Sequence, residues 1–382
     1  MANDKNFVIK NGLQAGRYLQ TGGTETAGSE VYNLAGASYD SKSFSVNAQD
    51  TNPRDLAFNA DGSKMYVVGI TNDNVHQYSL STAFDVSTAS YDSVSFSVLG
   101  QDGTAISMEF NPSGTKMFIA GSDNDSIYQY SLSTGFDLST ASYDSVSFSV
   151  TSQETAPYGL AFNTDGTKMF VVGQGSDTVF QYSLSTGFDL STASYDSVSF
   201  SISGQDGGVT GLAFNSSGTK MYIVGNGTDA VYQYSLSTAF DVSTASYDSV
   251  SFSIASQDAS PTNFVFSNDG SKMYVLGFAN KSIYQYSTVS LTQTLDLSTG
   301  TYFSFTPSGA TTVSFTNAPA SGKAVGFAVE INGDGSVITR PTSVKWPSGV
   351  APTATASKEV YAFVTTDGGT SYYGKRAAEG IL

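Results

Sequence analysis

The stretch "ASYDSVSFSV" at 89–98 decides the fold, because it recurs along the chain at a constant interval. It returns unchanged at 141–150, with one changed residue at 193–202 and 245–254, and in a looser form, "ASYDSKSFSV", at 37–46. A fixed period near 50 residues with strand-like content predicts a β-propeller or a related repeat array. The tyrosines of the five copies follow one another at a step of 52 residues: Tyr39, Tyr91, Tyr143, Tyr195 and Tyr247.

Each repeat contains four candidate strands. The first is short, as in "GLAF" at 159–162, and "NTDGTK" at 163–168 then supplies the Asp-Gly pair that tight hairpins favour. The second, such as "MFVVG" at 169–173, is apolar on both faces, as expected for a strand packed between two other blades. The third is exemplified by "IYQYSL" at 127–132. The fourth, "SVSFSV" at 93–98, alternates serine with apolar residues, which indicates an outer strand with one solvated face.

The two ends of the repeat region are offset. A fourth-type strand precedes the first complete set, and none follows after Tyr286. The circle closes if residues 41–47 supply the outer strand of the last blade, which removes an open sheet edge. We therefore predict an all-β fold in which residues 37–288 form a five-bladed β-propeller of four-stranded blades. An open β-solenoid built from the same strands is the alternative.

Composition narrows the classes of function. The 382 residues include no cysteine and one histidine, which excludes disulfides, thiolate chemistry and a two-histidine metal site. The formal net charge of −16 argues against nucleic-acid binding. No run of 18 apolar residues is present, so we expect no membrane insertion. The opening "MANDKNFVIK" lacks the apolar stretch of a secretory signal.

The repeats can be compared with one another to find a candidate binding face. Loops on one side of the ring, which carry "DGTK" and "SLSTGFDLSTASYDS", hardly change, and we call this side the repeated face. The inter-blade loops and the second-to-third-strand loops differ from blade to blade, and we call their side the variable face. Because loops tend to carry function, we expect a partner to bind the variable face, with Arg54, Tyr158 and Lys281 as candidates. Unconstrained drift of short loops is the competing explanation.

Two acidic rings recur on that face. A cation such as calcium could bind carboxylates near an axial channel, whereas Asp in a turn more simply accepts backbone N–H bonds. We expect the second role and no metal or other cofactor. The first ring consists of Asp50, Asp102, Glu154, Asp206 and Asp258. The second ring, which we also count among the candidate partner-binding residues, consists of Asp73, Asp125, Asp177 and Asp229, with Lys281 in the last blade.

Catalytic signals are sparse. His76 stands where other blades carry Tyr128, Phe180, Tyr232 and Tyr284, so we expect an aromatic packing position. No nucleophile elbow, P-loop or dinucleotide fingerprint is present, and no carboxylate pair is singled out by departure from the repeat. The repeated glutamines, such as Gln77, predict a structural ladder.

The flanking segments lack the repeat. Residues 289–382 hold seven short alternating strand candidates, which predict a C-terminal β-sandwich. Residues 1–36 are rich in Gly, Thr and Asn, and we expect them to form a separate anchoring segment. Trp346 is a core residue or a contact residue, and we list it with Tyr372 and Tyr373 as candidate contacts of this domain.

Two resemblances to known families add to these inferences. "AFNTDGTKMFVVGQGSDTVFQYSL" at 161–184 resembles the repeat of lactonase-type propellers, for the propeller alone. "KNFVIKNGLQAG" at 5–16 resembles the opening of appendage and tail-fibre proteins of tailed phages of marine and cyanobacterial type. "LDLSTGTYFSFTPSGATTVSFTNAPASGKAVGFAVEI" at 295–331 and "VKWPSGVAPTATASKEVYAFVTTDGGTSYYGKRA" at 344–377 are similar to the small C-terminal β-domain of that family.

The phage resemblance implies a non-catalytic structural protein of the virion. Its N-terminal segment would attach to other virion proteins, and its outer domains would meet a glycan or protein on the host surface. Fibres of this type are usually homotrimers. Two other functions stay open at this stage: a propeller hydrolase of the lactonase type, and a capsid or tail decoration protein without a receptor role.

Overall fold

The computed structural model describes residues 19–21, 24–27, 31–289, 291–307, 311–333, 338–347 and 349–381. The chain divides into two compact units, residues 39–288 and the two flanks taken together. None of the helices in the described part of the chain has the length and apolar character needed to cross a membrane.

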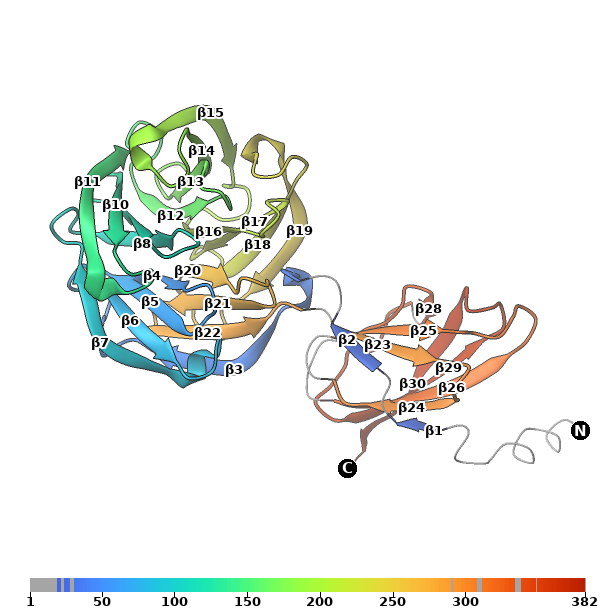
Figure 1. Ribbon diagram of the computed structural model, residues 1–382. Coiled ribbons are helices and arrows are strands. Elements are labelled where there is room, and N and C mark those ends of the chain that lie inside the picture. The colour runs from blue at the N-terminus through green and yellow to red at the C-terminus, as the bar shows by residue number, and fades with distance from the viewer. Residues whose placement is uncertain are drawn as a thin grey trace, which may run out of the picture. The chain divides into compact units, whose positions relative to one another are not determined.

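The first unit is a five-bladed β-propeller, as predicted, and each blade is a four-stranded sheet (Figure 1). In each blade the strands follow one another from the axis outwards. The first blade has β4 (Pro53–Phe58), β5 (Lys64–Gly69), β6 (Asn74–Leu80) and β7 (Ala89–Ser97). The second has β8 (Ala105–Phe110), β9 (Lys116–Gly121), β10 (Ser126–Leu132) and β11 (Ala141–Ser149). The third has β12 (Pro157–Phe162), β13 (Lys168–Gly173), β14 (Thr178–Leu184) and β15 (Ala193–Ser201).

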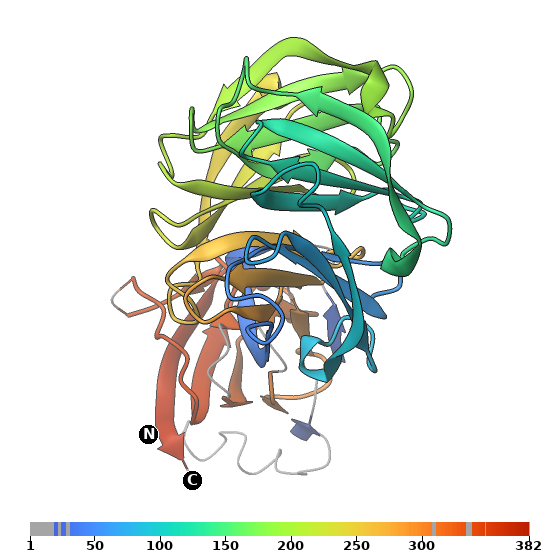
Figure 2. The same ribbon diagram turned by 90° about the vertical axis from the view of Figure 1, so that its left-hand side faces the viewer.

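The fourth and fifth blades complete the ring. The fourth has β16 (Val209–Phe214), β17 (Lys220–Gly225), β18 (Ala230–Leu236) and β19 (Ala245–Ser253). The fifth has β20 (Pro261–Phe266), β21 (Lys272–Gly277), β22 (Ser282–Ser287) and, from the start of the chain, β3 (Ser38–Ser45). The prediction that an early strand closes the last blade is therefore confirmed, and the open solenoid is not observed. Figure 2 shows the same blades from the side.

Burial along the strands follows the predicted pattern. The second strands are buried on both faces, whereas the outer strands alternate between more and less exposed residues. The apolar side chains form cores shared by neighbouring blades, and one such core joins Met65 and Tyr78 of the first blade to Tyr274 and Leu276 of the fifth. Because the junction between the last and first blades has the same kind of core as the others, the ring is closed by packing as well as by pairing.

The outer strand carries a β-bulge in every blade whose register is given. In the first blade it lies opposite Gln77 and Tyr78, where Ser93 adopts a φ of 58°. The bulge aims Asp92 inward, so that its Oδ2 accepts hydrogen bonds from Gln77 Nε2 (2.8 Å) and Lys64 Nζ (3.1 Å). Gln77 Oε1 also accepts a bond from the backbone N–H of Leu138 in the next blade (3.1 Å), so the predicted glutamine ladder links neighbouring blades.

Short 3₁₀ turns precede the outer strands, and the last four of them receive these glutamine contacts. In the four copies from η3 onwards, the side chain of an aspartate caps the turn, as Asp137 does by accepting a bond from the N–H of Ser139. The turns are η2 (Leu34–Gly36), η3 (Val86–Thr88), η4 (Leu138–Thr140), η5 (Leu190–Thr192) and η6 (Val242–Thr244).

The second unit consists of two sheets with one shared apolar core, in agreement with the predicted sandwich. One sheet has the order β1 (Leu19–Thr21), β24 (Tyr302–Phe305), β26 (Val325–Asn332), β29 (Lys358–Thr365), β30 (Tyr372–Ile381) and β28 (Val344–Lys345). The other has the order β2 (Thr24–Ala27), β23 (Leu291–Asp296), β25 (Thr311–Thr316) and β27 (Ile338–Thr339).

The N-terminal flank differs from the separate segment that we expected at 1–36. Its described strands extend the sheets of the second unit, since β1 pairs with β24 and β2 pairs with β23. These strands are three and four residues long and rich in polar residues, so they carry none of the alternation by which strands are recognised in a sequence. Residues 1–18, which include the whole of the phage-like opening at 5–16, lie outside the described residues.

Candidate functional site

The innermost strands surround the propeller axis in the order β4, β8, β12, β16 and β20, and each contacts the next (Figure 1). In all five blades the pairing between the first and second strands skips the second residue of the first strand, as between Pro53 and Asp55. Such a bulge redirects consecutive side chains and is frequent beside functional sites. Here the skipped residues form one layer at the variable face: Arg54, Ile106, Tyr158, Thr210 and Thr262.

That layer lines a pocket of about 230 Å³. Gln174, Asn226, Ser260 and Phe278 from the surrounding loops complete its wall. Most of these side chains are polar and neutral, and Arg54 is the one charged residue among the lining residues that the structure describes. The pocket therefore presents amides and hydroxyls around a single guanidinium group.

Arg54 is half-buried, and its surroundings leave its charge available. Burial lowers the pKa of its guanidinium, while Tyr158 and Asp50 act in the opposite direction. Its Nε is buried and has no hydrogen-bond partner among the described residues. Its guanidinium carbon lies 5.9 Å from the centre of the Phe278 ring. A partly desolvated cation without a salt bridge to a described residue gains from an anionic ligand, so this group is positioned to receive one.

Two of the seven predicted partner-binding residues meet in this pocket, and a third is close. Arg54 and Tyr158 both line it, whereas Lys281 contacts it through Phe278, with Lys281 Nζ 4.6 Å from the ring centre. Phe278 is 37% exposed, which is unusual for a large apolar residue in this propeller. The Phe278 ring therefore has two cations near it.

The second acidic ring occupies the tips of the hairpin loops and does not line the axial pocket. Its members have φ angles between 44° and 53°, the left-handed region that tight turns require: Asp73, Asp125, Asp177, Asp229 and Lys281. Their backbone carbonyls accept bonds from the outer strand, as Asp125 does from the N–H of Val150 (2.8 Å). Their first role is to shape the loop.

The first acidic ring fastens one loop of the variable face to another. Asp102 is 2% exposed and accepts bonds from the N–H groups of Thr104 (3.0 Å), Asp123 (3.2 Å) and Asn124 (3.1 Å). A side chain at Gly121 would collide with it, which accounts for the glycine at that position. Within the described ranges, no group of three or more His, Asp or Glu side chains has an arrangement suited to a metal ion.

Beneath the pocket, the third residues of the inner strands plug the axis. Asp55 is 2% exposed, and its Oδ2 accepts bonds from Ser107 Oγ (2.7 Å) and the N–H of Met108 (2.7 Å). Ser107 Oγ in turn accepts a bond from the N–H of Leu160 (3.2 Å), and Asn263 also hydrogen-bonds to Asp55. Burial raises the pKa of Asp55 to about 7. A hydrogen-bonded layer therefore lies between the variable face and the repeated face.

Two axial carboxyls correct our statement that no carboxylate pair is singled out by a departure from the repeat. Asp55 replaces Ser, Gly, Gly and Asn of the other blades, and Glu109 replaces Ala57, Ala161, Ala213 and Val265. Burial, followed by the charge of Asp55, raises the pKa of Glu109 to about 8. The signal was present in the sequence, but it appears only when the first strands of the blades are aligned position by position.

His76 is confirmed as a packing residue. It is 5% exposed, and its ring meets Tyr91 edge-on at 5.8 Å. Neither ring nitrogen has a hydrogen-bond partner among the described residues, and burial lowers its pKa.

The candidate contacts of the sandwich separate into two groups. Tyr372 is 4% exposed and packs 4.8 Å from the ring of Phe315, so its expected contact role is corrected to a core role. Trp346 also packs against this core, under the guanidinium of Arg340 at 5.6 Å. Tyr373 is 60% exposed, because neighbouring residues of a strand point to opposite faces.

The chain was compared with family models, curated proteins and solved structures, and only the solved structures gave matches. No family model and no curated protein matches the chain. Among solved structures, a "putative 6-phosphogluconolactonase" from Bacteroides uniformis is 14% identical with a TM-score of 0.39, over 58% of this chain and 63% of that one. A functionally unknown protein from Desulfotomaculum acetoxidans is 12% identical with a TM-score of 0.38, over 59% of this chain and 79% of that one.

A second "putative 6-phosphogluconolactonase", from Bacteroides fragilis, is 15% identical with a TM-score of 0.36, over 59% of this chain and 64% of that one. This chain spans less than two thirds of the length of either lactonase-named protein. Identities this low say nothing of activity.

Proposed function

We propose that the protein is a non-catalytic binding protein whose variable face recognises an acidic glycan through the axial pocket. One observation carries this proposal: Arg54, desolvated and without a salt bridge, lies among hydroxyl and amide side chains in a concave site. Guanidinium groups bind carboxylate and sulfate groups, and the surrounding amides and hydroxyls suit the hydroxyls of a sugar. Phe278 at the rim offers an apolar ring on which a sugar can stack.

The composition of the pocket favours binding over hydrolysis. The described residues that line it include neither a carboxylate nor a histidine, the groups that commonly act as general bases. His76 is buried in aromatic packing instead of facing the pocket wall. For the lactonase alternative, turnover of an ester or lactone by the purified protein, with and without added calcium, is the direct test.

We further propose that this binding protein is part of a phage appendage. The support is the similarity of the sequence at both ends to tail-fibre proteins, together with a sandwich domain that could serve attachment. Antibodies against the propeller should label the appendages of purified particles. Labelling of the capsid would instead favour a decoration protein, and absence of labelling would overturn the virion role.

Binding of acidic glycans to the purified full chain tests the recognition role. Glycan-array screening should select uronate- or sulfate-bearing saccharides, and Arg54→Gln should weaken their binding at least about tenfold. Lys168→Gln removes a cation from the repeated face and should leave binding unchanged. A blank array, or equal binding by wild type and Arg54→Gln, would contradict the proposal.

A further inference from the structure

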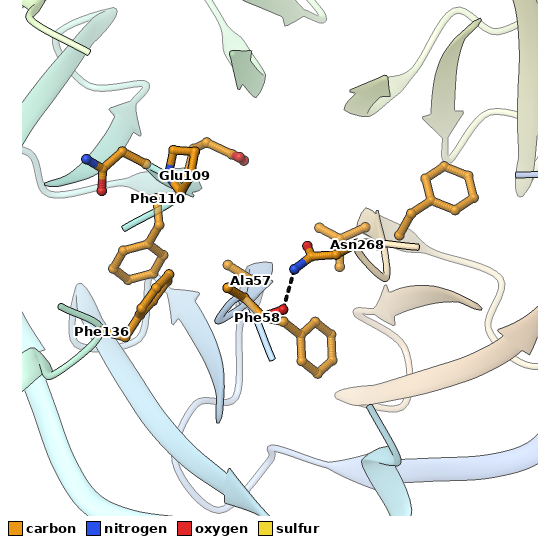
Figure 3. Close-up of a pocket in the computed structure, with 11 residues that line it drawn as sticks. Ala57, Phe58, Glu109, Phe110, Phe136 and Asn268 are labelled. Atoms are coloured by element: carbon orange, nitrogen blue, oxygen red, sulfur yellow. Dashed lines mark hydrogen bonds between the residues drawn. The ribbon is translucent and has the colours of Figure 1, made fainter. Parts of the chain in front are cut away.

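The repeated face has its own axial opening, on the far side of the Asp55 layer. It forms a pocket of about 360 Å³ between the first, second and fifth blades. Phe58, Phe110, Phe136 and Phe266 contribute aromatic walls, and Glu109 provides its only charged side chain among the described lining residues. Figure 3 shows the Glu109 carboxylate pointing towards the middle of the ring of blades, away from Phe110.

Glu109 is anomalous at this position. The other four blades carry Ala or Val there, so nothing in the blade architecture requires a carboxyl group. The carboxyl makes no salt bridge and no hydrogen bond to a described residue, although lysines elsewhere on the propeller are paired, such as Lys116 with Asp144 at 2.6 Å. An uncompensated acid in such surroundings destabilises the fold, which is typical of groups kept for function.

The two amide side chains of the pocket already make hydrogen bonds within the protein. Asn111 Oδ1 accepts a bond from the N–H of Lys116 (3.0 Å), and its Nδ2 donates to Thr115 Oγ1 (3.2 Å). Asn268 Nδ2 donates to the carbonyl of Ala60. The pocket therefore offers a ligand one anionic acceptor and aromatic surface.

This combination selects one class of ligand. Calcium and magnesium require six or more oxygen ligands, and a single carboxylate among phenylalanines supplies too few. An ammonium group gains both from the carboxylate and from aromatic ring faces, which attract cations electrostatically. A volume near 360 Å³ lies at the small end of ligand pockets, so the ligand is a small molecule.

We propose that the axial opening of the repeated face is a second binding site. It takes a small organic cation, such as a quaternary ammonium ion or a protonated primary amine, with Glu109 as its counter-ion. The site lies on the opposite side of the Asp55 layer from the Arg54 pocket, and it does not depend on glycan binding there. Asp55 is the one titratable group that acts on Glu109 among the described residues.

Calorimetric titration of the full chain with choline tests this site. The matched probe is 3,3-dimethyl-1-butanol, which has the shape of choline without its charge. Choline should bind and the neutral isostere should not. Glu109→Gln should weaken choline binding at least about tenfold. Asp61→Asn removes a negative charge from a loop of the same face and should change binding less than about twofold.

Dependence on pH provides a second measurement. The cation requires the ionised carboxylate, so wild-type affinity should rise between pH 6 and pH 9, with the pKa of Glu109 about 8. Glu109→Gln should show no such rise. Thermal unfolding of both variants establishes that each is folded.

Four outcomes would overturn the proposal. The first is equal binding of choline and its isostere, and the second is choline binding that survives Glu109→Gln. The third is the absence of binding by choline, ethanolamine and methylammonium at concentrations of about 10 mM, since even weak sites bind in that range. Displacement of choline by calcium at equal concentration would reassign the site to an inorganic cation.

Discussion

Gln285 Oε1 in the last blade accepts a hydrogen bond from the backbone N–H of Val86 in the first blade at 3.1 Å. Gln77 makes the same contact with Leu138, at the same distance, between the first and second blades. The junction between the ends of the repeat is thus chemically equal to an internal junction. Two distinct axial openings follow from this closure, one on each face.

Because the ring is closed, two matched mutations should lower the free energy of unfolding by equal amounts. Asp40 on β3 accepts bonds from Lys272 Nζ (2.7 Å) and Gln285 Nε2 (2.9 Å), and Asp248 makes the same contacts with Lys220 and Gln233. Alanine at either position leaves these donors unpaired, so each should lower the free energy of unfolding by about 1–3 kcal/mol. Urea denaturation measures both. If Asp40→Ala left the free energy of unfolding unchanged while Asp248→Ala lowered it, β3 would not close the ring.

The axial layer predicts a large effect from a small deletion. Ser107 Oγ both donates to Asp55 and accepts from the N–H of Leu160, and Ser107 is 0% exposed. Ser107→Ala should therefore lower the free energy of unfolding by about 1–3 kcal/mol. Ser95→Ala on an exposed outer strand should cost less than about 0.5 kcal/mol. Equal values for the two would mean that the layer contributes no stability.

His76 is expected to make the wild-type protein less stable at acidic pH than a variant that lacks it. Burial lowers its pKa below the value of about 6.5 in the unfolded chain, so the unfolded state binds more protons as the pH falls from 7 to 5. Wild-type stability should consequently decline across that range. His76→Phe, which installs the residue of the third blade, removes this term, and its advantage in melting temperature should be larger at pH 5 than at pH 8. A constant advantage would contradict the lowered pKa.

Glu109 predicts the opposite dependence. Because its pKa in the folded protein is about 8, the folded state holds a proton that the unfolded state has released above about pH 4.5. Wild-type stability should therefore fall between pH 5 and pH 8 relative to Glu109→Ala, which restores the residue of the first, third and fourth blades. The gap should widen to about 4 kcal/mol at pH 8, as a pKa shift of this size implies, and vanish near pH 4. A destabilised Glu109→Ala at pH 8 would contradict the account.

The sequence predicted the ring because the repeat is nearly exact. The 52-residue step specified five equal blades, and the extra outer strand before the first set indicated closure. Alternation along "SVSFSV" and the doubly apolar second strands were both confirmed, because burial follows side-chain direction directly.

The axial chemistry was harder to predict because it depends on departures from the repeat. Arg54 and Tyr158 were identified as members of a variable face. Their meeting at the axis depends on a bulge in the inner strands, and no residue type in the sequence predicts that bulge. Glu109 was overlooked because a lone acid in a strand resembles ordinary variation. The expected contact role of Tyr372 was wrong because strand register, rather than residue type, decides which face is buried.

Crystals of the protein soaked with a uronic acid such as galacturonate test the central claim most directly. We predict density for the sugar in the variable-face pocket, with its carboxylate within hydrogen-bond distance of the Arg54 guanidinium and its ring near Tyr158 or Phe278. Crystals of Arg54→Gln should lack that density. A sugar bound on another surface, or bound in the pocket equally well without Arg54, would contradict the assignment of this site.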